Sequence, residues 1–312
     1  MMEEREIRYE ELTYPSADGK TTVHAYIWHP VGEVKGIIQL SHGMCEYVQR
    51  YDAWARRFAA AGYVFCGNDH LGHGYTAESP EALGNIPPHG DELLVEDVHA
   101  LSLLIKARYP ETPLILYGHS MGSFVARCYL SKYGTELSAA LISGTAGPGL
   151  PTGLGCKLAR LMGRVKGQEH RSKFLTSLGF GSYNKRFEQE QDALSWLTRD
   201  KTVRANYRKD TFCTFIFTTE GYATLFTLIS RISKKSWAKT LPRDLPVLLF
   251  AGDQDPVGNY GKGVRAVCER MEKAGCNVSL RLYEGGRHEM HNELNADEVF
   301  ADLIAYLKEN VK

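Results

Sequence analysis

Apolar residues along the first half of the chain occur in two alternating kinds of run. Buried strands are predicted from short apolar runs at residues 36–42, 63–69 and 113–118. Between them, apolar residues recur at helical spacing over 50–63 and 91–110. Strands that alternate with helices of this length are typical of parallel βαβ units. We therefore predict an α/β fold with a mostly parallel central sheet flanked by helices.

The two ends of the chain complete this pattern. Residues 21–30, TTVHAYIWHP, alternate their side chains after an Asp18-Gly19 turn, as expected for a hairpin at a sheet edge. From residue 245 onward a strand, a helix, another strand and a last amphipathic helix follow in turn. We expect both ends to belong to the same α/β domain.

The alternation of predicted strands and helices stops between these two parts of the chain. The interruption begins with the breaker-rich sequence TAGPGLPTGLG and continues with mixed helix and loop that is basic and aromatic. The prediction is one α/β domain built from residues 1–147 and 241–312, with an insertion over 148–240.

Charge distinguishes the insertion from the rest of the chain. The formal net charge is zero, yet residues 151–240 hold 17 Lys and Arg against 7 Asp and Glu, a balance of +10. No nucleic-acid motif accompanies this charge, so nucleic acid is not an expected partner. Three interpretations remain open: attraction to an anionic membrane surface, attraction to an anionic substrate, and an ordinary solvated helical surface.

One apolar run stops at a serine that lies between two glycines. Gly118-His119-Ser120-Met121-Gly122 fits the pattern G-x-S-x-G, with a predicted strand before it and a predicted helix after it. A turn this sharp strains the serine backbone, and flanking glycines remove Cβ atoms that would clash. The hydroxyl then stands exposed at the start of the helix. We predict that Ser120 is a nucleophile.

A neutral serine hydroxyl needs a base to take its proton and an acid to orient that base. Downstream, the strand in LLFAGDQDP ends at Asp253 and Asp255, and LYEGGRHEMHNE holds His288 and His291. Serine, acid and histidine thus occur in the order usual for enzymes with this kind of elbow. The order alone leaves both aspartates and both histidines as candidates.

At these residues the chain resembles the α/β-hydrolase superfamily, and within it the monoacylglycerol lipase and lysophospholipase-like serine hydrolases. Five ordered motifs spread over nearly the whole chain carry the resemblance: SHGMCEYVQRY, NDHLGHG, GHSMGS, AGDQDPVGNYGKGV and YEGGRHEMHNE. A further segment, LSWLTRD, resembles the bacterial branch. The resemblance implies an α/β-hydrolase fold in which the insertion is a helical cap over the serine.

The resemblance also selects among the candidate residues. It assigns the acid to Asp255, the second aspartate of G-D-x-D, and the base to His288, the first histidine of H-x-x-H. Placement on loops supports both choices. Asp253 is then expected to bond the turn backbone, and His291 to belong to the following helix.

The oxyanion hole is expected from two backbone N–H groups. Met121 follows the nucleophile, and the resemblance places the second N–H on Met44, whose side chain is also expected to narrow the acyl pocket. Glu46 and Arg50 lie four residues apart and are expected to form a local pair that positions this loop. No metal or organic cofactor is expected.

The resemblance implies hydrolysis of carboxylic esters of single-chain lipids, above all of monoacylglycerol to fatty acid and glycerol, through an acyl-enzyme on Ser120. Residues 211–232 are apolar and almost free of charge, so they form the core of the cap or line a tunnel for an acyl chain. Alternatives are a lysophospholipase, a thioesterase, acyl transfer to an alcohol or a general small-ester carboxylesterase. A non-catalytic binding protein of this fold is a more distant alternative.

Cysteine usage and the chain ends bear on location. The seven cysteines are scattered and form no CxxC pair, which indicates reduced thiols. The charged N-terminus is neither a secretory signal nor a transit peptide, and no apolar run is long enough to span a membrane. We expect a cytoplasmic protein, and peripheral contact of the basic cap with the inner membrane surface is one of the interpretations left open above. The sequence predicts no oligomeric state.

Overall fold

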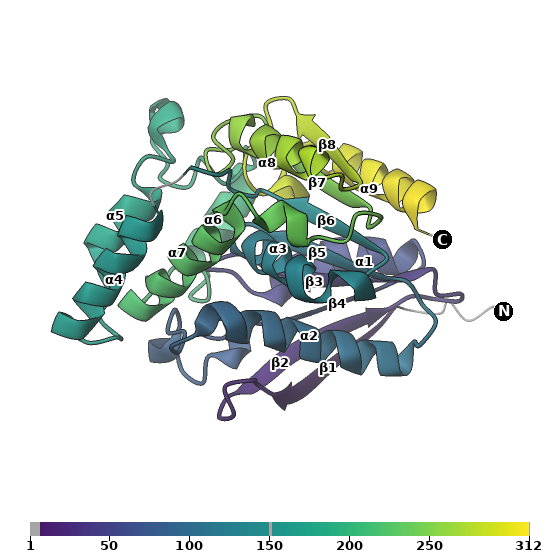
Figure 1. Cartoon of the computed structure of the whole chain (residues 1–312), viewed down its shortest axis with the longest axis horizontal. Coiled ribbons are helices and arrows are strands. Elements are labelled where there is room, and N and C mark those ends of the chain that lie inside the picture. The colour runs from purple at the N-terminus through teal and green to yellow at the C-terminus, as the bar shows by residue number, and fades with distance from the viewer. Residues whose placement is uncertain (1–6, 150–151, 312) are drawn as a thin grey trace.

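The computed structural model describes residues 7–149 and 152–311, and within them one eight-stranded sheet runs through the molecule in the order β1-β2-β4-β3-β5-β6-β7-β8 (Figure 1). The strands are β1 (Arg8–Pro15), β2 (Thr22–His29), β3 (Gly36–Ser41), β4 (Tyr63–Asn68), β5 (Leu114–His119), β6 (Ala139–Ser143), β7 (Val247–Gly252) and β8 (Val278–Tyr283). The pairs β1–β2 and β2–β4 are antiparallel, and all other neighbours are parallel. The predicted edge hairpin and the mostly parallel sheet are confirmed.

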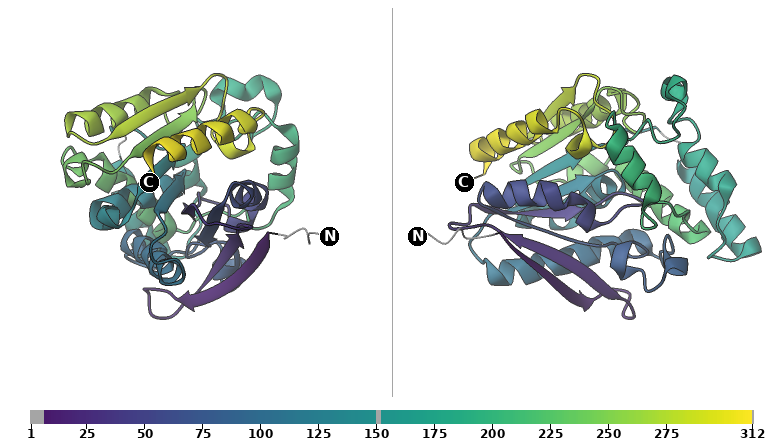
Figure 2. Two further views of the ribbon diagram at one scale, coloured as in Figure 1. Left: turned by 90° about the vertical axis from the view of Figure 1, so that its right-hand side faces the viewer. Right: turned by 180° about the vertical axis from the view of Figure 1, so that it is seen from behind.

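Helices cover both faces of this sheet (Figure 2). On one face lie α1 (Asp52–Ala60) and α9 (Ala296–Asn310), whose apolar side chains share a buried cluster with the sheet. The other face is covered by α2 (Gly90–Arg108), α3 (Met121–Tyr133) and α8 (Lys262–Lys273). The central strands are therefore buried on both faces, which explains why they appear in the sequence as continuous apolar runs.

The chain between β6 and β7 forms four helices within the described residues: α4 (Thr152–Lys166), α5 (Lys173–Phe180), α6 (Lys201–Lys209) and α7 (Thr219–Ser233). Helix α7 packs against α3 and against α4. In Figure 1, α4 and α5 lie at the end of the molecule opposite the two chain termini. We call this helical segment the cap, and its predicted limits, 148–240, stay a prediction.

Two expectations from the sequence concern targeting and membrane spans. Residues 1–6, on which part of the targeting prediction rests, lie outside the described residues. Across the described ranges, no helix is both long and apolar enough to cross a membrane.

Candidate active site

Ser120 lies at the carboxyl end of β5, where the strand turns directly into α3. Its backbone has φ 51° and ψ −121°, a conformation that side chains rarely adopt. A Cβ on Gly122 would lie 1.9 Å from the carbonyl oxygen of Ser41, and one on Gly118 would lie 2.6 Å from the Cβ of Ala126. Both glycines of G-x-S-x-G are thus required by close packing around the turn.

The structure brings Ser120, His288 and Asp255 together from three loops at the carboxyl ends of β5, β8 and β7. Nε2 of His288 lies 2.8 Å from Oγ of Ser120, and Nδ1 lies 3.0 Å from Oδ2 of Asp255. The other carboxylate oxygen of Asp255 accepts the N–H of Val257 at 2.9 Å. A proton on Nδ1 leaves Nε2 free to accept the serine hydroxyl proton, which is the geometry of a nucleophile beside an oriented base.

Asp255 also sets the proton affinity of His288. Burial lowers the pKa of His288, but the charge of Asp255 and its hydrogen bond outweigh burial, so the pKa lies above its ordinary value of 6.5. The imidazolium that forms when His288 takes a proton is therefore stabilised where it is made.

The two predicted oxyanion donors, Met44 and Met121, belong to segments next to Ser120. Met121 is the first residue of α3, so its N–H is among the helical donors without an intrahelical partner. Met44 lines the cavities next to Ser120, and a Cβ on the preceding Gly43 would lie 3.0 Å from the Cβ of Ser120. Both residues neighbour the serine, and their roles as oxyanion donors stay a prediction.

A buried ion cluster holds the Met44 loop. Glu46 accepts the N–H of Gly43 and the hydroxyl of Tyr51, the latter at 2.9 Å. Arg50 donates to Glu46 at 2.8 Å, which confirms the predicted local pair, and also donates twice to Glu289. Burial raises the pKa of Glu46, whereas Arg50 overcomes burial and lowers the pKa of Glu289.

Glu289 was missed by the sequence analysis. It follows His288 directly, so Arg50 ties the Met44 loop to the loop that carries the base. The available signal was a second acidic residue beside the candidate base, but local sequence does not show that Arg50 reaches it.

The candidates not chosen as acid and base have structural partners. Asp253 accepts the N–H of Gly285 at 2.9 Å, so its predicted turn-bonding role is confirmed. His291 stacks on Tyr51 with ring centroids 4.2 Å apart. It lies in a separate 3₁₀ turn, Met290–Asn292, and not in the following helix, which begins at Ala296, so that prediction was wrong.

Two cavities meet at Ser120 beneath the cap. The first has a volume of about 400 Å³ and runs from Ser120 and Glu46 towards α6. The second has a volume of about 230 Å³ and lies between α3 and the cap helices. Apolar cap side chains that line the second cavity are Leu154, Leu158, Leu178, Phe180, Leu225, Phe226 and Ile229.

The apolar stretch 211–232 contributes both to the core and to the wall of a cavity, and the acyl chain expected in that cavity stays a prediction. Phe226 and Ile229 line the second cavity, while Phe217 and Leu228 are fully buried in the core. Met44 lines both cavities, as expected for a side chain that narrows the space beside the serine.

Comparisons with known proteins agree with this architecture. The family model described as serine aminopeptidase, S33, matches residues 32–295. The chain is 29% identical to the monoacylglycerol lipase of Mycolicibacterium smegmatis over 90% of this chain and 91% of that one. It is 26% identical to human monoglyceride lipase over 92% of this chain and 86% of that one.

A solved structure gives the same picture. The crystal structure of a thermostable carboxyl esterase from Bacillus coagulans, in complex with glycerol, superposes with a TM-score of 0.92 at 30% identity and covers 98% of this chain and 100% of that one. The predicted α/β-hydrolase fold and the resemblance to monoacylglycerol lipase-like serine hydrolases are confirmed. The chain belongs to the serine aminopeptidase S33 family of α/β-hydrolases.

Proposed function

We propose that this protein hydrolyses monoacylglycerols, or closely related single-chain lipid esters, with Ser120 as nucleophile, His288 as base and Asp255 as the acid that orients it. The observation that carries the proposal is the hydrogen-bonded series of these three side chains at the meeting point of two cavities. The similarity to monoacylglycerol lipases supports the choice of ester.

The reaction follows from the geometry in two halves. Oγ of Ser120 attacks the ester carbonyl carbon while Nε2 of His288 takes the hydroxyl proton, and the carbonyl electron pair moves onto oxygen. The N–H groups of Met44 and Met121 stabilise this oxyanion. When it collapses, the carbon–oxygen bond to the alcohol breaks and the alcohol receives the proton from Nε2.

The second half frees the acyl group. Water attacks the acyl-enzyme carbonyl as His288 takes its proton, and collapse of the new oxyanion returns that proton to Oγ of Ser120. Apolar side chains line most of both cavities, so either one suits an acyl chain and the other leaves room for the alcohol.

The cap also suggests where the substrate comes from, and we include contact with an anionic membrane surface in the proposal. Helices α4 and α5 expose apolar side chains with large exposed fractions: Leu154 62%, Leu161 58%, Val165 75%, Phe174 58% and Leu178 49%. Exposed basic residues lie among them: Lys157, Arg160, Arg164, Lys166 and Lys173. Leu154 and Leu178 also line the second cavity, so the apolar face continues towards Ser120. The cytoplasmic location inferred from the cysteines remains part of this proposal.

A matched substrate panel tests the proposed activity. Wild type and Ser120→Ala are compared on short, medium and long monoacylglycerols, a lysophospholipid, an acyl thioester and a soluble short-chain ester. We expect monoacylglycerols to be turned over fastest and Ser120→Ala to lose at least about 10³-fold in kcat.

Any other result of the substrate panel would favour one of the alternative functions. Preference for the lysophospholipid or the thioester would reassign the substrate, and preference for the soluble ester would make the protein a general carboxylesterase. Turnover that survives Ser120→Ala would mean that Ser120 is not the nucleophile, and no turnover at all would favour a binding protein.

A further inference from the structure

The cap holds the residues on both sides of His288. The side chain of Arg287 donates to the carboxylate of Glu190 and to the backbone carbonyl oxygen of Ser195. On the other side, the N–H of Glu289 donates to the carbonyl oxygen of Leu197 at 2.8 Å. The loop that carries the base is therefore bonded to the cap immediately before and immediately after the histidine.

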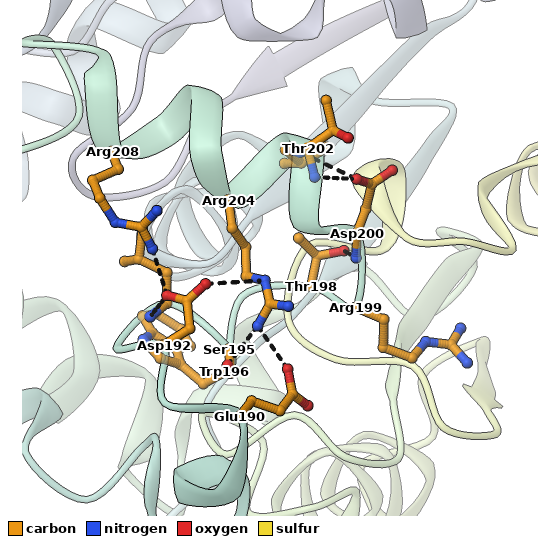
Figure 3. A network of polar contacts seen from close by, with 12 residues as sticks. Glu190, Asp192, Ser195, Trp196, Thr198, Arg199, Asp200, Thr202, Arg204 and Arg208 are labelled. Atoms are coloured by element: carbon orange, nitrogen blue, oxygen red, sulfur yellow. Dashed lines mark hydrogen bonds and ion pairs between the residues drawn. The ribbon is translucent and has the colours of Figure 1, made fainter.

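Glu190 is the acidic centre of this contact. It is the last residue of the 3₁₀ turn Lys185–Glu190. Its carboxylate forms ion pairs with Arg287 of the base loop and with Arg204 of α6. The α6 partner is Arg204, whose side chain is only 2% exposed and donates to Glu190 at 2.8 Å. Figure 3 shows Arg204 directed at Glu190 on one side and at Asp192 on the other.

Glu190 is suited to hold Arg287 at every pH at which the enzyme would work. Hydrogen bonds from Arg287, opposed by burial and aided by Arg204, lower the pKa of Glu190 to about 2. The carboxylate thus stays ionised wherever a histidine base works, and the planar guanidinium of Arg287 meets it through two nitrogens. Arg287 also lies over the ring of Phe187, 4.1 Å from its centroid, which fixes the plane of the guanidinium.

We propose that Glu190 is a positioning residue for the reaction: by holding Arg287, it fixes the loop that sets His288 against Ser120. This inference rests on the proposed roles of Ser120 and His288. It means that the cap builds part of the catalytic geometry, in addition to covering the substrate. A displacement of about 1 Å at a reacting group can cost about 100-fold in rate, so loss of the Glu190–Arg287 contact should lower kcat. Glu190 itself lines neither cavity, so KM should change less.

The test compares Glu190→Gln with Glu188→Gln, a matched change on the same turn at an exposed side chain. The substrate is p-nitrophenyl acetate, which is small enough to need little of the cap for binding. We expect Glu190→Gln to lower kcat by about 10-fold or more with KM within about two-fold, and Glu188→Gln to leave both unchanged. A Glu190→Gln protein with a lower melting temperature and unchanged kcat would overturn the proposal, because Glu190 would then only stabilise the cap.

A double-mutant cycle shows whether Glu190 acts through Arg287. Arg287→Lys keeps the charge but loses the contact through two nitrogens. If Glu190 acts through Arg287, kcat of the double variant Glu190→Gln/Arg287→Lys should be no lower than kcat of the slower single variant. Fully additive losses would overturn the proposal. If Glu190→Gln does not fold, Glu190→Asp replaces it in both measurements, with the same expected direction and the same contradicting results.

Ser120→Ala, measured in parallel, separates this inference from the proposed function. Activity that persists in Ser120→Ala removes the proposed function and the inference together. Activity lost in Ser120→Ala but unchanged in Glu190→Gln removes the inference alone.

Discussion

Ser120 is held in a backbone conformation that costs about 1–3 kcal/mol for a residue with a side chain. The cost is tolerated because the turn is enclosed: Gly122 packs against the backbone of Ser41 and His42, and the N–H of Ser120 donates to the carbonyl oxygen of Ser143 at 3.0 Å. The conformation aims Oγ at His288, so the strain is part of how the site is built.

The first prediction concerns this packing. Gly122→Ala places a Cβ 1.9 Å from the carbonyl oxygen of Ser41, so β3 or α3 has to move. We expect the free energy of unfolding to fall by about 1–3 kcal/mol in urea titration, and ester hydrolysis to fall with it. Gly153→Ala on α4 is the control, because a Cβ there meets nothing within 4 Å. Equal stability of the two variants would contradict the close packing.

The second prediction concerns pH. A base must be neutral to act, so kcat/KM should fall as the pH drops through the pKa of His288, which lies above 6.5. Asp255→Asn removes the charge that raises this pKa and leaves the burial that lowers it. The acid limb should therefore move to lower pH, and kcat at the optimum should fall by about 10³- to 10⁴-fold.

The matched control is Asp253→Asn, because Asp253 bonds the turn at Gly285 and not the histidine. Its acid limb should stay in place. A limb that moves in Asp253→Asn and stays in Asp255→Asn would reverse the assignment of the acid.

At the residue scale, sequence reasoning found the candidates that lie in short local patterns, and the structure brings these together, but it missed contacts between distant segments. Ser120 and the aspartate pair lie in short recognisable patterns at strand ends. Glu190 lies in the cap, 97 residues from its partner Arg287. No spacing rule connects such positions, because the fold alone brings them together.

At the scale of elements, one guanidinium joins three segments around the site. Arg50 binds Glu46 of its own loop and Glu289 of the base loop, and it lies over the ring of Tyr207 of α6, 4.9 Å from the centroid. Both carboxylates are buried, so they depend on this cation for compensation.

The third prediction follows from that dependence. Arg50→Met leaves two buried carboxylates without their cation, and we expect the free energy of unfolding to fall by about 3–5 kcal/mol. Arg56→Met on α1 is the comparison, because Arg56 pairs with Asp52 where both side chains are nearly half exposed. Arg56→Met should lower the free energy of unfolding by less than about 1 kcal/mol. Similar losses in urea titration for the two variants would show that Arg50 is not central to the fold.

The elements themselves were predictable in the core and less so in the cap. Core strands are buried on both faces and bounded by breakers, so their apolar runs are clear. The cap helices α4 and α5 instead carry apolar residues on their exposed face, among them Leu161 and Val165, so apolar positions there do not identify the face that packs on the molecule. His291 was misplaced for a related reason: a 3₁₀ turn separates the base loop from α9, and such short turns leave no periodic signal.

At the scale of the whole molecule, exposed apolar and basic side chains occur together on α4 and α5, at one end of the fold. Helices α4 and α5 lie beyond the rest of the cap in Figure 1 and in the right-hand view of Figure 2. The insertion carries a balance of +10 in a chain of zero net charge, so the remainder carries −10. An anionic surface should therefore attract this end and repel the other, which orients the cap towards the lipid.

The fourth prediction tests this orientation with vesicles of phosphatidylglycerol and of phosphatidylcholine in a flotation assay. We expect binding to the anionic vesicles, weakened by about 10-fold in the double variant Leu161→Ser/Val165→Ser, because these side chains enter the interface. The matched control is Leu103→Ser/Leu104→Ser on α2, where two leucines are also exposed. Equal weakening by both pairs, or equal binding to both kinds of vesicle, would contradict an oriented contact through the cap.

Salt distinguishes the electrostatic from the apolar contribution to the contact between the cap and the vesicle. Raising the ionic strength from about 0.1 M to 1 M shortens the Debye length from about 10 Å to 3 Å, so charge attraction fades while apolar insertion does not. Hydrolysis of a soluble ester should change little, because its chemistry takes place among buried groups. Hydrolysis of monoacylglycerol in anionic vesicles should fall together with vesicle binding. If it stayed constant while binding was lost, the substrate would reach Ser120 from solution, and the apolar face of α4 and α5 would need another explanation.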